Sequence, residues 1–458
     1  MEALLVKNAG ERGAIYNFNT EYLSHVQDEH GVTATFLNLI TNTEFTLRAK
    51  YLVGMDGARS KVVEQLDLPL EGIMARAGTV YVTFKADLSK YVQHRPAILQ
   101  WIVNPEASFG DLGMGLLRAI TPWNEWIMGW GFDISKGEPK VTEEQVRARL
   151  DAFVGEHVEE VEIQKLSYWY VNQTWATEYS KGRVFCGGDA VHRHPPSSGL
   201  GSNTCMQDAF NLGWKLAYAL KGWSQPALLD SYTTERAPVG KQIVARANQS
   251  RFDYKHLKEV FGFDHGIITQ KQMLDRIFAE DEQGAEIREK LFKALEIKNF
   301  EFNAQGVELN QRYTSNAVIV ESEHEIFEKD EQLYLQATTR SGAKIPHTWL
   351  INSNGQKVST LDITGKGRFT LLTGLSGKGW KQAVEALGLP YLDVIQIGSR
   401  EYRDVYGTWN TQSEIHESGA VLVRPDGYVA WRYQDCTNDA FDYENTLKAV
   451  LKQIQLAV

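Results

Sequence analysis

GGDAVHRHPPSSGLGSN, at residues 187–203, connects an apolar strand predicted over 183–186 to a long helix. The two glycines directly after the strand carry no side chains, so a ligand can approach the backbone there. Asp189 follows them and offers a carboxylate that accepts hydrogen bonds from hydroxyl groups, for example those of a polyol. This order of residues predicts a strand, a turn and a helix arranged around a bound ligand.

The second half of this stretch prepares the start of the helix. Gly199, Leu200 and Gly201 form a turn, and Ser202 and Asn203 are good N-cap residues, so we expect a helix over about 203–221. A helix start offers free N–H groups and the positive end of a dipole, which stabilise negative charge on a ligand. Apolar residues at helical spacing predict its buried side; they are Met206, Ala209, Leu212, Leu216 and Leu220.

A second stretch of this kind, YLVGMDGARS, lies at residues 51–60. A buried strand is predicted over 51–53, with Asp56 and Gly57 in the turn after it. Arg59 and Ser60 could bind a phosphate or cap the next helix. An Asp-Gly pair alone is most often a plain turn, but this one repeats the pattern of an acid after a strand. Together the two stretches indicate a ligand site with two parts.

Composition restricts the class of protein. The 458 residues suffice for about three domains, and 48 basic against 58 acidic side chains give a net charge of −10, which argues against nucleic-acid and anionic-membrane partners. No apolar run is long enough to cross a membrane, no signal peptide is evident and the three cysteines form no CxxC pair. We therefore expect a cytoplasmic protein. His192 and His194 lack an evident third ligand, so no metal is expected.

Other segments predict the surrounding layers. Residues 78–133 are rich in β-branched and aromatic side chains and predict an antiparallel sheet. Its tryptophans belong either to a hydrophobic substrate pocket or to a core. Thr142 and Gln145 match a capping box, so a helix begins there. Residues 252–316 are expected to be mainly helical, and strand-like runs from about residue 317 indicate a separate small α/β domain.

The two acid-bearing stretches resemble the DG and GD flavin motifs of class A FAD-dependent aromatic hydroxylases. Residues 183–215 are especially similar to the phenol 2-monooxygenase and 2,4-dichlorophenol 6-monooxygenase family. The resemblance covers nearly the whole chain. It implies a p-hydroxybenzoate-hydroxylase-like FAD-binding fold of α/β and α+β class, with an antiparallel substrate-domain sheet and a C-terminal thioredoxin-like domain. It also implies FAD and NADPH as cofactors, a small aromatic substrate and a homodimer.

The same resemblance implies a role for each part of the chain. Asp189 would bind the ribityl chain, Asp56 would lie near the pyrophosphate and the approach of NADPH, and Trp130 would face the substrate. The implied cofactor-binding residues are Asp56, Gly57, Gly188, Asp189, Ala190, Pro195, Pro196, Gly199, Leu200, Gly201 and Asn203. The implied domains are the remainder of an FAD-binding domain (1–70), a substrate-binding sheet (71–165), the FAD-binding domain with the GD motif (166–250), a helical connection (251–316) and the thioredoxin-like domain (317–458).

One element of the family is missing from this sequence. Family members begin with a βαβ unit whose GxGxxG turn holds the FAD pyrophosphate at a helix start. Gly10 and Gly13 do not follow a strand at that spacing, so we expect an N-terminally truncated or degenerate form. The groups that activate the phenol in the family come partly from that missing segment, and the catalytic residues are therefore left unassigned.

The resemblance implies hydroxylation of a phenolic substrate with NAD(P)H and O2, through a flavin C4a-hydroperoxide. The substrate is either a simple phenol or a polyketide-derived aromatic. The alternative hypothesis is a truncated or degenerate, non-catalytic flavoprotein homologue that acts as a folded or dimerising partner. Binding of FAD separates the two hypotheses.

Overall fold

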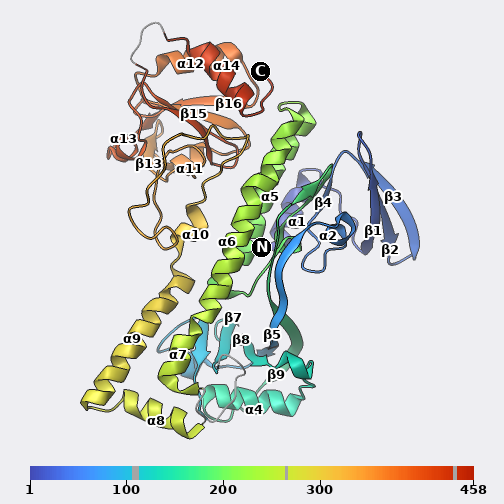
Figure 1. The fold of residues 1–458 in the computed structure, drawn as a ribbon, viewed down its shortest axis with the longest axis vertical. Coiled ribbons are helices and arrows are strands. Elements are labelled where there is room, and N and C mark those ends of the chain that lie inside the picture. The colour runs from blue at the N-terminus through green and yellow to red at the C-terminus, as the bar shows by residue number, and fades with distance from the viewer. Residues whose placement is uncertain (106–112, 264–266, 437–440) are drawn as a thin grey trace.

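The computed structural model describes residues 1–105, 113–263, 267–436 and 441–458, so the predicted sheet segment 78–133 lies partly outside the described residues. Two long helices, α5 (Gly201–Lys221) and α6 (Ser231–Phe252), run along the long axis of the molecule, with the C-terminal domain at one end and the large sheet at the other (Figure 1). Within the described ranges, no helix is long and apolar enough to cross a membrane.

The predicted strand, turn and helix stretches form the first layer. β4 (Leu52–Gly54) and β11 (Val184–Cys186) are parallel neighbours, and β10 (Ser180–Lys181) pairs with β11 on the other side. Helix α2 (Lys61–Leu66) follows β4. The strand at 51–53 was expected to be buried, but Val53 is 40% exposed, because β4 is the edge strand of this small sheet.

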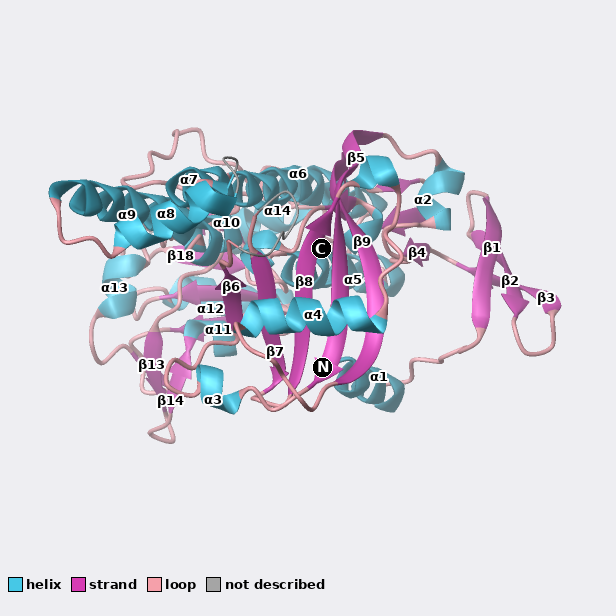
Figure 2. Ribbon diagram, turned by 90° about the horizontal axis from the view of Figure 1, so that it is seen from below, coloured by secondary structure: helices cyan, strands magenta, loops and turns pink. Residues whose placement is uncertain are grey.

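A small antiparallel sheet precedes this layer. Helix α1 (Glu2–Glu11) is followed by β1 (Thr20–Gln27), β2 (Val32–Asn38) and β3 (Thr43–Ala49), which pair in the order β1-β2-β3. Figure 2 shows this sheet projecting from the side of the molecule. Apolar and polar residues alternate around 32–36 and 45–49, and both stretches form strands.

The large sheet has six strands in the order β12-β9-β5-β8-β7-β6. Helix α4 (Glu143–Val154) crosses one of its faces (Figure 2), and its Thr142 capping box forms as predicted. Apolar side chains of α4 and of the sheet share one core, which fixes the sheet from that side. The remaining bounds here are β5 (Leu70–Lys85), α3 (Ser89–Val92), β6 (Leu99–Ile102), β7 (Gly115–Thr121), β8 (Glu125–Phe132), β9 (Glu162–Ala176) and β12 (His192–Arg193).

Helices connect the large sheet to the C-terminal domain. They are α7 (Tyr254–Phe261), α8 (Ile267–Ile277), α9 (Glu282–Phe302) and α10 (Gln305–Leu309). Three of the predicted domain limits fall inside continuous elements, since β5 crosses 70/71, β9 crosses 165/166 and α6 crosses 250/251. The domain division therefore stays a prediction.

The C-terminal domain has the mixed sheet and flanking helices of a thioredoxin-like fold. Its central sheet has the order β16-β15-β18-β19, with β15 and β16 parallel and the other pairs antiparallel. Leu371, Trp380 and Leu447 belong to its buried core. The bounds are β13 (Trp349–Asn352), β14 (Lys357–Ser359), α11 (Thr360–Ile363), β15 (Phe369–Thr373), α12 (Lys378–Leu387), β16 (Leu392–Gln396), β17 (Tyr402–Arg403), α13 (Thr408–Gln412), β18 (Ala420–Val423), β19 (Val429–Tyr433) and α14 (Tyr443–Gln453).

The predicted buried side of α5 was largely wrong. Leu212 is buried, but Met206 and Leu220 are 43% and 49% exposed. The buried side instead carries polar residues, including Asp208 and Lys215, which find charged partners on α6. Because buried ion pairs satisfy one another, a hydrophobic count cannot identify this face.

Candidate active site

The two acid-bearing turns lie side by side. In the parallel pair, Cys186 is opposite Gly54, and the backbone N–H of Gly187 donates to the Gly54 carbonyl at 3.2 Å. The carboxyl ends of neighbouring parallel strands meet at one edge of a sheet, which is where ligands bind in open α/β folds. Asp56 and Asp189, separated by more than a hundred residues of sequence, therefore follow strands that end at the same edge of this sheet.

Asp56 is engaged within its own turn. The Ser60 hydroxyl donates to Asp56 Oδ1 at 2.5 Å, and the Val62 N–H donates to Oδ2 at 3.3 Å. Ser60 in turn accepts from the Val63 N–H at 2.9 Å and caps α2. Of the two roles predicted for Ser60, the structure shows helix capping.

Asp189 is exposed and presents its carboxylate outward from a short 3-10 turn over Gly188–Ala190. Its side-chain contact in the described part of the chain is a long one, 3.6 Å from the Cys205 Sγ. Gly188 is buried with φ of +64°, a conformation that glycine adopts without strain. The carboxylate is thus available to a ligand hydroxyl.

The start of α5 lies at a second special turn. Ser198 and Gly199 both have positive φ, 69° and 64°, and α5 begins at Gly201 with Leu200 as its N-cap. The prediction that Ser202 and Asn203 cap this helix was wrong: both lie inside its first turn, and Asn203 Nδ2 donates back to the Gly199 carbonyl at 3.1 Å. No side chain caps this start within the described residues, so its N–H groups can bind an electron-rich ligand edge.

These features fit FAD. Asp189 supplies an acceptor for ribityl hydroxyls, and the uncapped start of α5 supplies donors for the flavin ring edge. The turn from Pro195 to Gly199 also borders a cavity of about 420 Å³. The flavin ring would therefore lie where the turn and the cavity meet.

The cavity lies between this turn, one face of the large sheet and the helices α6, α7 and α9. Its volume is typical of small-molecule sites. Side chains alternate across a strand, and alternate residues of the central strands accordingly contribute. The lining residues are Thr79, Tyr81, Leu99, Trp101, Met114, Leu116, Arg118, Ile127, Gly129, Trp130, Gly131, Trp169, Val171, Pro195, Pro196, Ser197, Ser198, Gly199, Arg251, Tyr254, Glu301 and Phe302.

Trp130 borders this cavity, but its ring packs elsewhere. Its neighbours Gly129 and Gly131 occupy the cavity side of β8, and the indole of Trp130 is 9% exposed within the core beneath α4. The Arg149 guanidinium of α4 lies 5.4 Å from that ring. Strand alternation points the ring to the face of the sheet opposite the cavity. The Trp130 ring therefore does not face the cavity, contrary to what the resemblance had implied. On the face of the sheet that borders the cavity, the aromatic residues are Tyr81, Trp101 and Trp169.

Polar groups in the cavity come from distant parts of the chain. Burial raises the pKa of Tyr81, and the charge of Arg118 opposes this shift. The Tyr254 hydroxyl donates to Glu301 Oε2 at 3.0 Å, and Glu301 also pairs with Lys298 at 2.5 Å. No sequence motif links strands β5 and β7 to helices α7 and α9, so these groups could not be predicted from local patterns.

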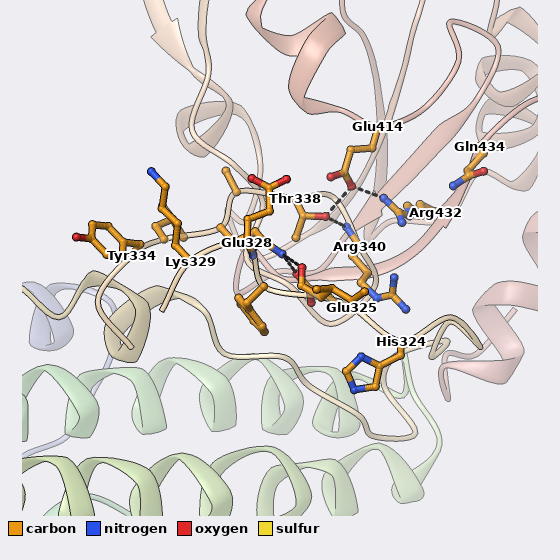
Figure 3. A pocket seen from close by; sticks show the side chains of 15 residues that line it. His324, Glu325, Glu328, Lys329, Tyr334, Thr338, Arg340, Glu414, Arg432 and Gln434 are labelled. Carbon is orange, nitrogen blue, oxygen red and sulfur yellow. Dashed lines mark hydrogen bonds and ion pairs between the residues drawn. The ribbon is translucent and has the colours of Figure 1, made fainter. Parts of the chain in front are cut away.

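A larger crevice of about 690 Å³ lies at the C-terminal domain (Figure 3). Several of its charged side chains are already paired: Arg432 bonds to Glu414 and to Glu321, and the Thr338 hydroxyl donates to Glu414 at 2.6 Å. These pairs satisfy the charges that a ligand would need. We therefore place the candidate active site in the smaller, mainly apolar cavity beside the turn from Pro195 to Gly199.

The two histidines of the motif have structural partners. His192 Nε2 bonds to Asp208 at 2.9 Å, and His194 Nδ1 lies 2.7 Å from the Pro195 carbonyl. The structure does group ligand atoms of Asp189, His192 and Cys205 within 4.8 Å. His192 Nε2 is already bonded to Asp208, and the Cys205 thiol donates to Asp189 Oδ1 at 3.6 Å. We assign Asp189, His192 and Cys205 to the segment that runs from β11 into the start of α5.

Comparison with known proteins identifies the class. An FAD binding domain family model matches residues 1–247, and an aromatic-ring hydroxylase C-terminal model matches 338–455. These matches, the paired acid turns and the adjoining cavity define an FAD-dependent monooxygenase that hydroxylates aromatic rings. The chain belongs to the FAD binding domain family of aromatic-ring hydroxylases.

Two relatives and one solved structure are similar to nearly the whole of this chain. The chain is 43% identical to 2,4-dichlorophenol 6-monooxygenase of Cupriavidus pinatubonensis over 96% of this chain and 75% of that protein. It is 41% identical to phenol 2-monooxygenase of a Pseudomonas species, over 96% of this chain and 72% of that one. The crystal structure of the flavin-dependent monooxygenase PieE with FAD and substrate matches with a TM-score of 0.92 and 40% identity, over 99% of this chain and 78% of that chain.

Proposed function

We propose that this protein hydroxylates a phenolic ring bound in the 420 Å³ cavity, with FAD held at the Asp189 turn and NADPH as the reductant. The observation that carries the proposal is the shared border: the turn from Pro195 to Gly199 lines the same cavity as the face of the large sheet. A substrate there would lie directly against the flavin ring. When bound, FAD supplies the oxygen-transfer chemistry.

The residues of the chain would bind and orient the two molecules. Asp189 accepts ribityl hydroxyls, and the backbone of Gly188 and Ala190 forms its turn. Pro195, Pro196, Gly199, Leu200, Gly201 and Asn203 form the turn and helix start along the flavin ring. Asp56 and Gly57, beside them on the adjacent strand end, would lie near the pyrophosphate and the approach of NADPH.

The cavity favours a substrate with one polar end. Most of the lining is apolar or aromatic, and it excludes water from the reacting ring. Tyr81, Arg118 and Glu301 are among its polar groups, and a phenolic oxygen would be oriented by groups of this kind. The catalytic base stays unassigned.

We further propose a simple phenol as substrate. The basis is that the phenol-type relatives are 41–43% identical, whereas the tetracenomycin A2 monooxygenase-dioxygenase of Streptomyces glaucescens is 32% identical. A polyketide-derived aromatic is the alternative, supported by the 31% identity to a putative polyketide hydroxylase of Streptomyces halstedii. We also propose a homodimer, as the family resemblance of the sequence implies.

The test is reconstitution with FAD followed by product analysis. We expect the purified chain to bind FAD and to consume NADPH faster when a phenol is added, with a ring-hydroxylated product in the mass spectrum. Chlorophenols, phenol and a tricyclic polyketide phenol form the panel, and Gly129→Val is the matched cavity variant. A Cβ at Gly129 would come 2.6 Å from the Tyr81 ring, so this variant should keep FAD and lose the larger substrates.

The opposite results would overturn the proposal. A chain that binds no FAD at high concentration would favour the non-catalytic alternative. Bound FAD with no hydroxylated product from any phenol would exclude the phenolic substrate. Equal activity of Gly129→Val toward small and large phenols would show that the substrate binds outside this cavity.

A further inference from the structure

The buried carboxylate of Asp208 supports the turn over Gly188–Ala190, called the flavin turn below, on the side opposite the Asp189 carboxylate. Asp208 lies on α5, is completely buried, and accepts the Gly188 N–H at 3.0 Å and His192 Nε2 at 2.9 Å on the same oxygen, Oδ2. Its other oxygen, Oδ1, accepts from Arg236 Nε at 2.7 Å. Asp208 thus hydrogen-bonds to Gly188, to His192 of β12 and to Arg236 of α6.

The turn needs such an acceptor. Gly188 leaves the end of β11 with φ of +64° and is buried, and a buried N–H without an acceptor is costly. Space around the turn is also limited, since a Cβ at Gly187 would come 2.7 Å from the Tyr232 hydroxyl. The Asp208 carboxylate satisfies the N–H in this confined conformation.

The same carboxylate fixes the orientation of His192. An ionised carboxylate accepts hydrogen bonds and donates none, so His192 Nε2 must carry the hydrogen. His192 Nδ1 is buried without a partner in the described part of the chain, so the bond to Asp208 is what holds the ring. His192 pairs with Trp175 of β9, which ties the turn to the large sheet.

Asp208 remains ionised despite its burial. Burial alone would raise the pKa of this carboxyl, but the charge of Arg236 and the hydrogen bonds from His192 and Gly188 hold it below its usual value. Arg236 also donates to the Tyr313 hydroxyl at 2.9 Å. The pair is therefore compensated in charge and in hydrogen bonds, as a buried ion pair requires.

We propose that Asp208 is a positioning residue for the flavin: it fixes the Gly188 turn so that the Asp189 carboxylate faces the ribityl chain. This inference rests on the proposed function, in which Asp189 binds FAD. Asp208 acts through the backbone of Gly188 and the ring of His192. It points away from the ligand side of the turn, toward α6.

Lys215 provides a matched control on the same helix. It lies seven residues further along α5, is also completely buried, and pairs with Glu235 at 2.8 Å. Glu235 keeps two bonds from Arg424 when Lys215 is removed. Lys215→Met therefore disturbs a buried ion pair of α5 without touching the flavin turn.

The experiment compares Asp208→Asn, Lys215→Met and the double variant Asp208→Asn/Arg236→Met. The readouts are the Kd for FAD, the visible spectrum of the bound flavin and the Tm. We expect Asp208→Asn to weaken FAD binding about tenfold to a hundredfold and to alter the flavin spectrum. Lys215→Met should lower the Tm and leave the Kd for FAD within about twofold, because the flavin turn keeps its bonds.

The double variant separates positioning from stability. It removes the Arg236 charge that Asp208→Asn leaves unpaired, so it should recover Tm while its FAD binding stays weak. It also decides the matter if Asp208→Asn alone does not fold. Wild-type Kd in the double variant, or equally weak FAD binding in Lys215→Met, would overturn the proposal.

An Asp189→Ala variant distinguishes this inference from the proposed function. If Asp189→Ala loses FAD but Asp208→Asn does not, the flavin site stands and Asp208 is only structural. If Asp189→Ala binds FAD like wild type, the assigned ribityl contact is wrong, and the positioning role falls with it. Weak binding in both variants supports both statements.

Discussion

The turns at Asp56 and Asp189 have similar sequences, but their carboxylates make different contacts. Each follows one of two adjacent parallel strands, and each carries an acid beside glycine. The Asp56 carboxylate is engaged by Ser60 and the Val62 N–H at the start of α2. The Asp189 carboxylate is exposed, while a second acid, Asp208, satisfies the backbone of its turn.

The difference shows how a fold frees one acid for a ligand. At the Asp56 turn the acid itself supports the following helix. At the Asp189 turn that structural task passes to a buried residue twenty positions later on α5. The Asp189 carboxylate, whose side-chain contact in the described part of the chain is the long one to Cys205, keeps its acceptor capacity for ligand hydroxyls.

The largest expected effect is on FAD binding. Asp189→Ala removes an ionised acceptor of ribityl hydroxyls, so we expect about a hundredfold weaker binding, since such bonds contribute about 1.5–3 kcal/mol. Fluorescence quenching during an FAD titration measures it. Asp189→Asn keeps one acceptor oxygen and should fall in between. An unchanged Kd in Asp189→Ala would remove the contrast between the two turns.

A smaller effect on stability is expected at the other turn. Asp56→Ala should lower the free energy of unfolding by about 1 kcal/mol, because the start of α2 loses support. Urea unfolding measures it, with Ser60→Ala as partner in a double-mutant cycle. The two changes should be less than additive, since Ser60 donates to Asp56. Additive losses would mean that the two side chains act separately. We expect FAD binding to weaken less than in Asp189→Ala.

The smallest effect concerns the reactivity of Cys205. Burial and the charge of Asp189 raise its pKa to about 12, so its thiolate fraction still grows between pH 8 and 10. Alkylation by iodoacetamide should therefore accelerate about tenfold per pH unit over this range, as followed by peptide mass spectrometry. A rate that levels near pH 9 would contradict the raised pKa.

Asp189→Asn sharpens this measurement. Removing the adjacent negative charge should lower the pKa of Cys205 and speed its alkylation at pH 8. Asp56→Asn is the control, because Asp56 contributes to the raised pKa of Cys186 instead. An equal acceleration in both variants would show that the two acids are not distinguished at this site.

Local patterns predicted much of the fold. The strands and turns at both acids, the Thr142 capping box and the antiparallel sheet follow from neighbouring residues, and the family resemblance is confirmed by the matches. Two of the errors have a common origin. The buried face of α5 and the orientation of Trp130 depend on what packs against each element. Neither α6 nor α4 is visible in those local patterns.

The sequence by itself determined the class of protein, because the strand, acid, proline and glycine pattern at 187–203 encodes a flavin turn within a few consecutive residues. The support of the Asp189 turn follows only from the packed fold: Asp56 is held by Ser60 and Val62 within its own turn, whereas Gly188 is held by Asp208 of the next helix. Asp208, Arg236 and Glu301 are ordinary charged residues in sequence. They acquire their places at the flavin turn and the cavity when the helices pack, since buried charges need partners and the fold supplies them.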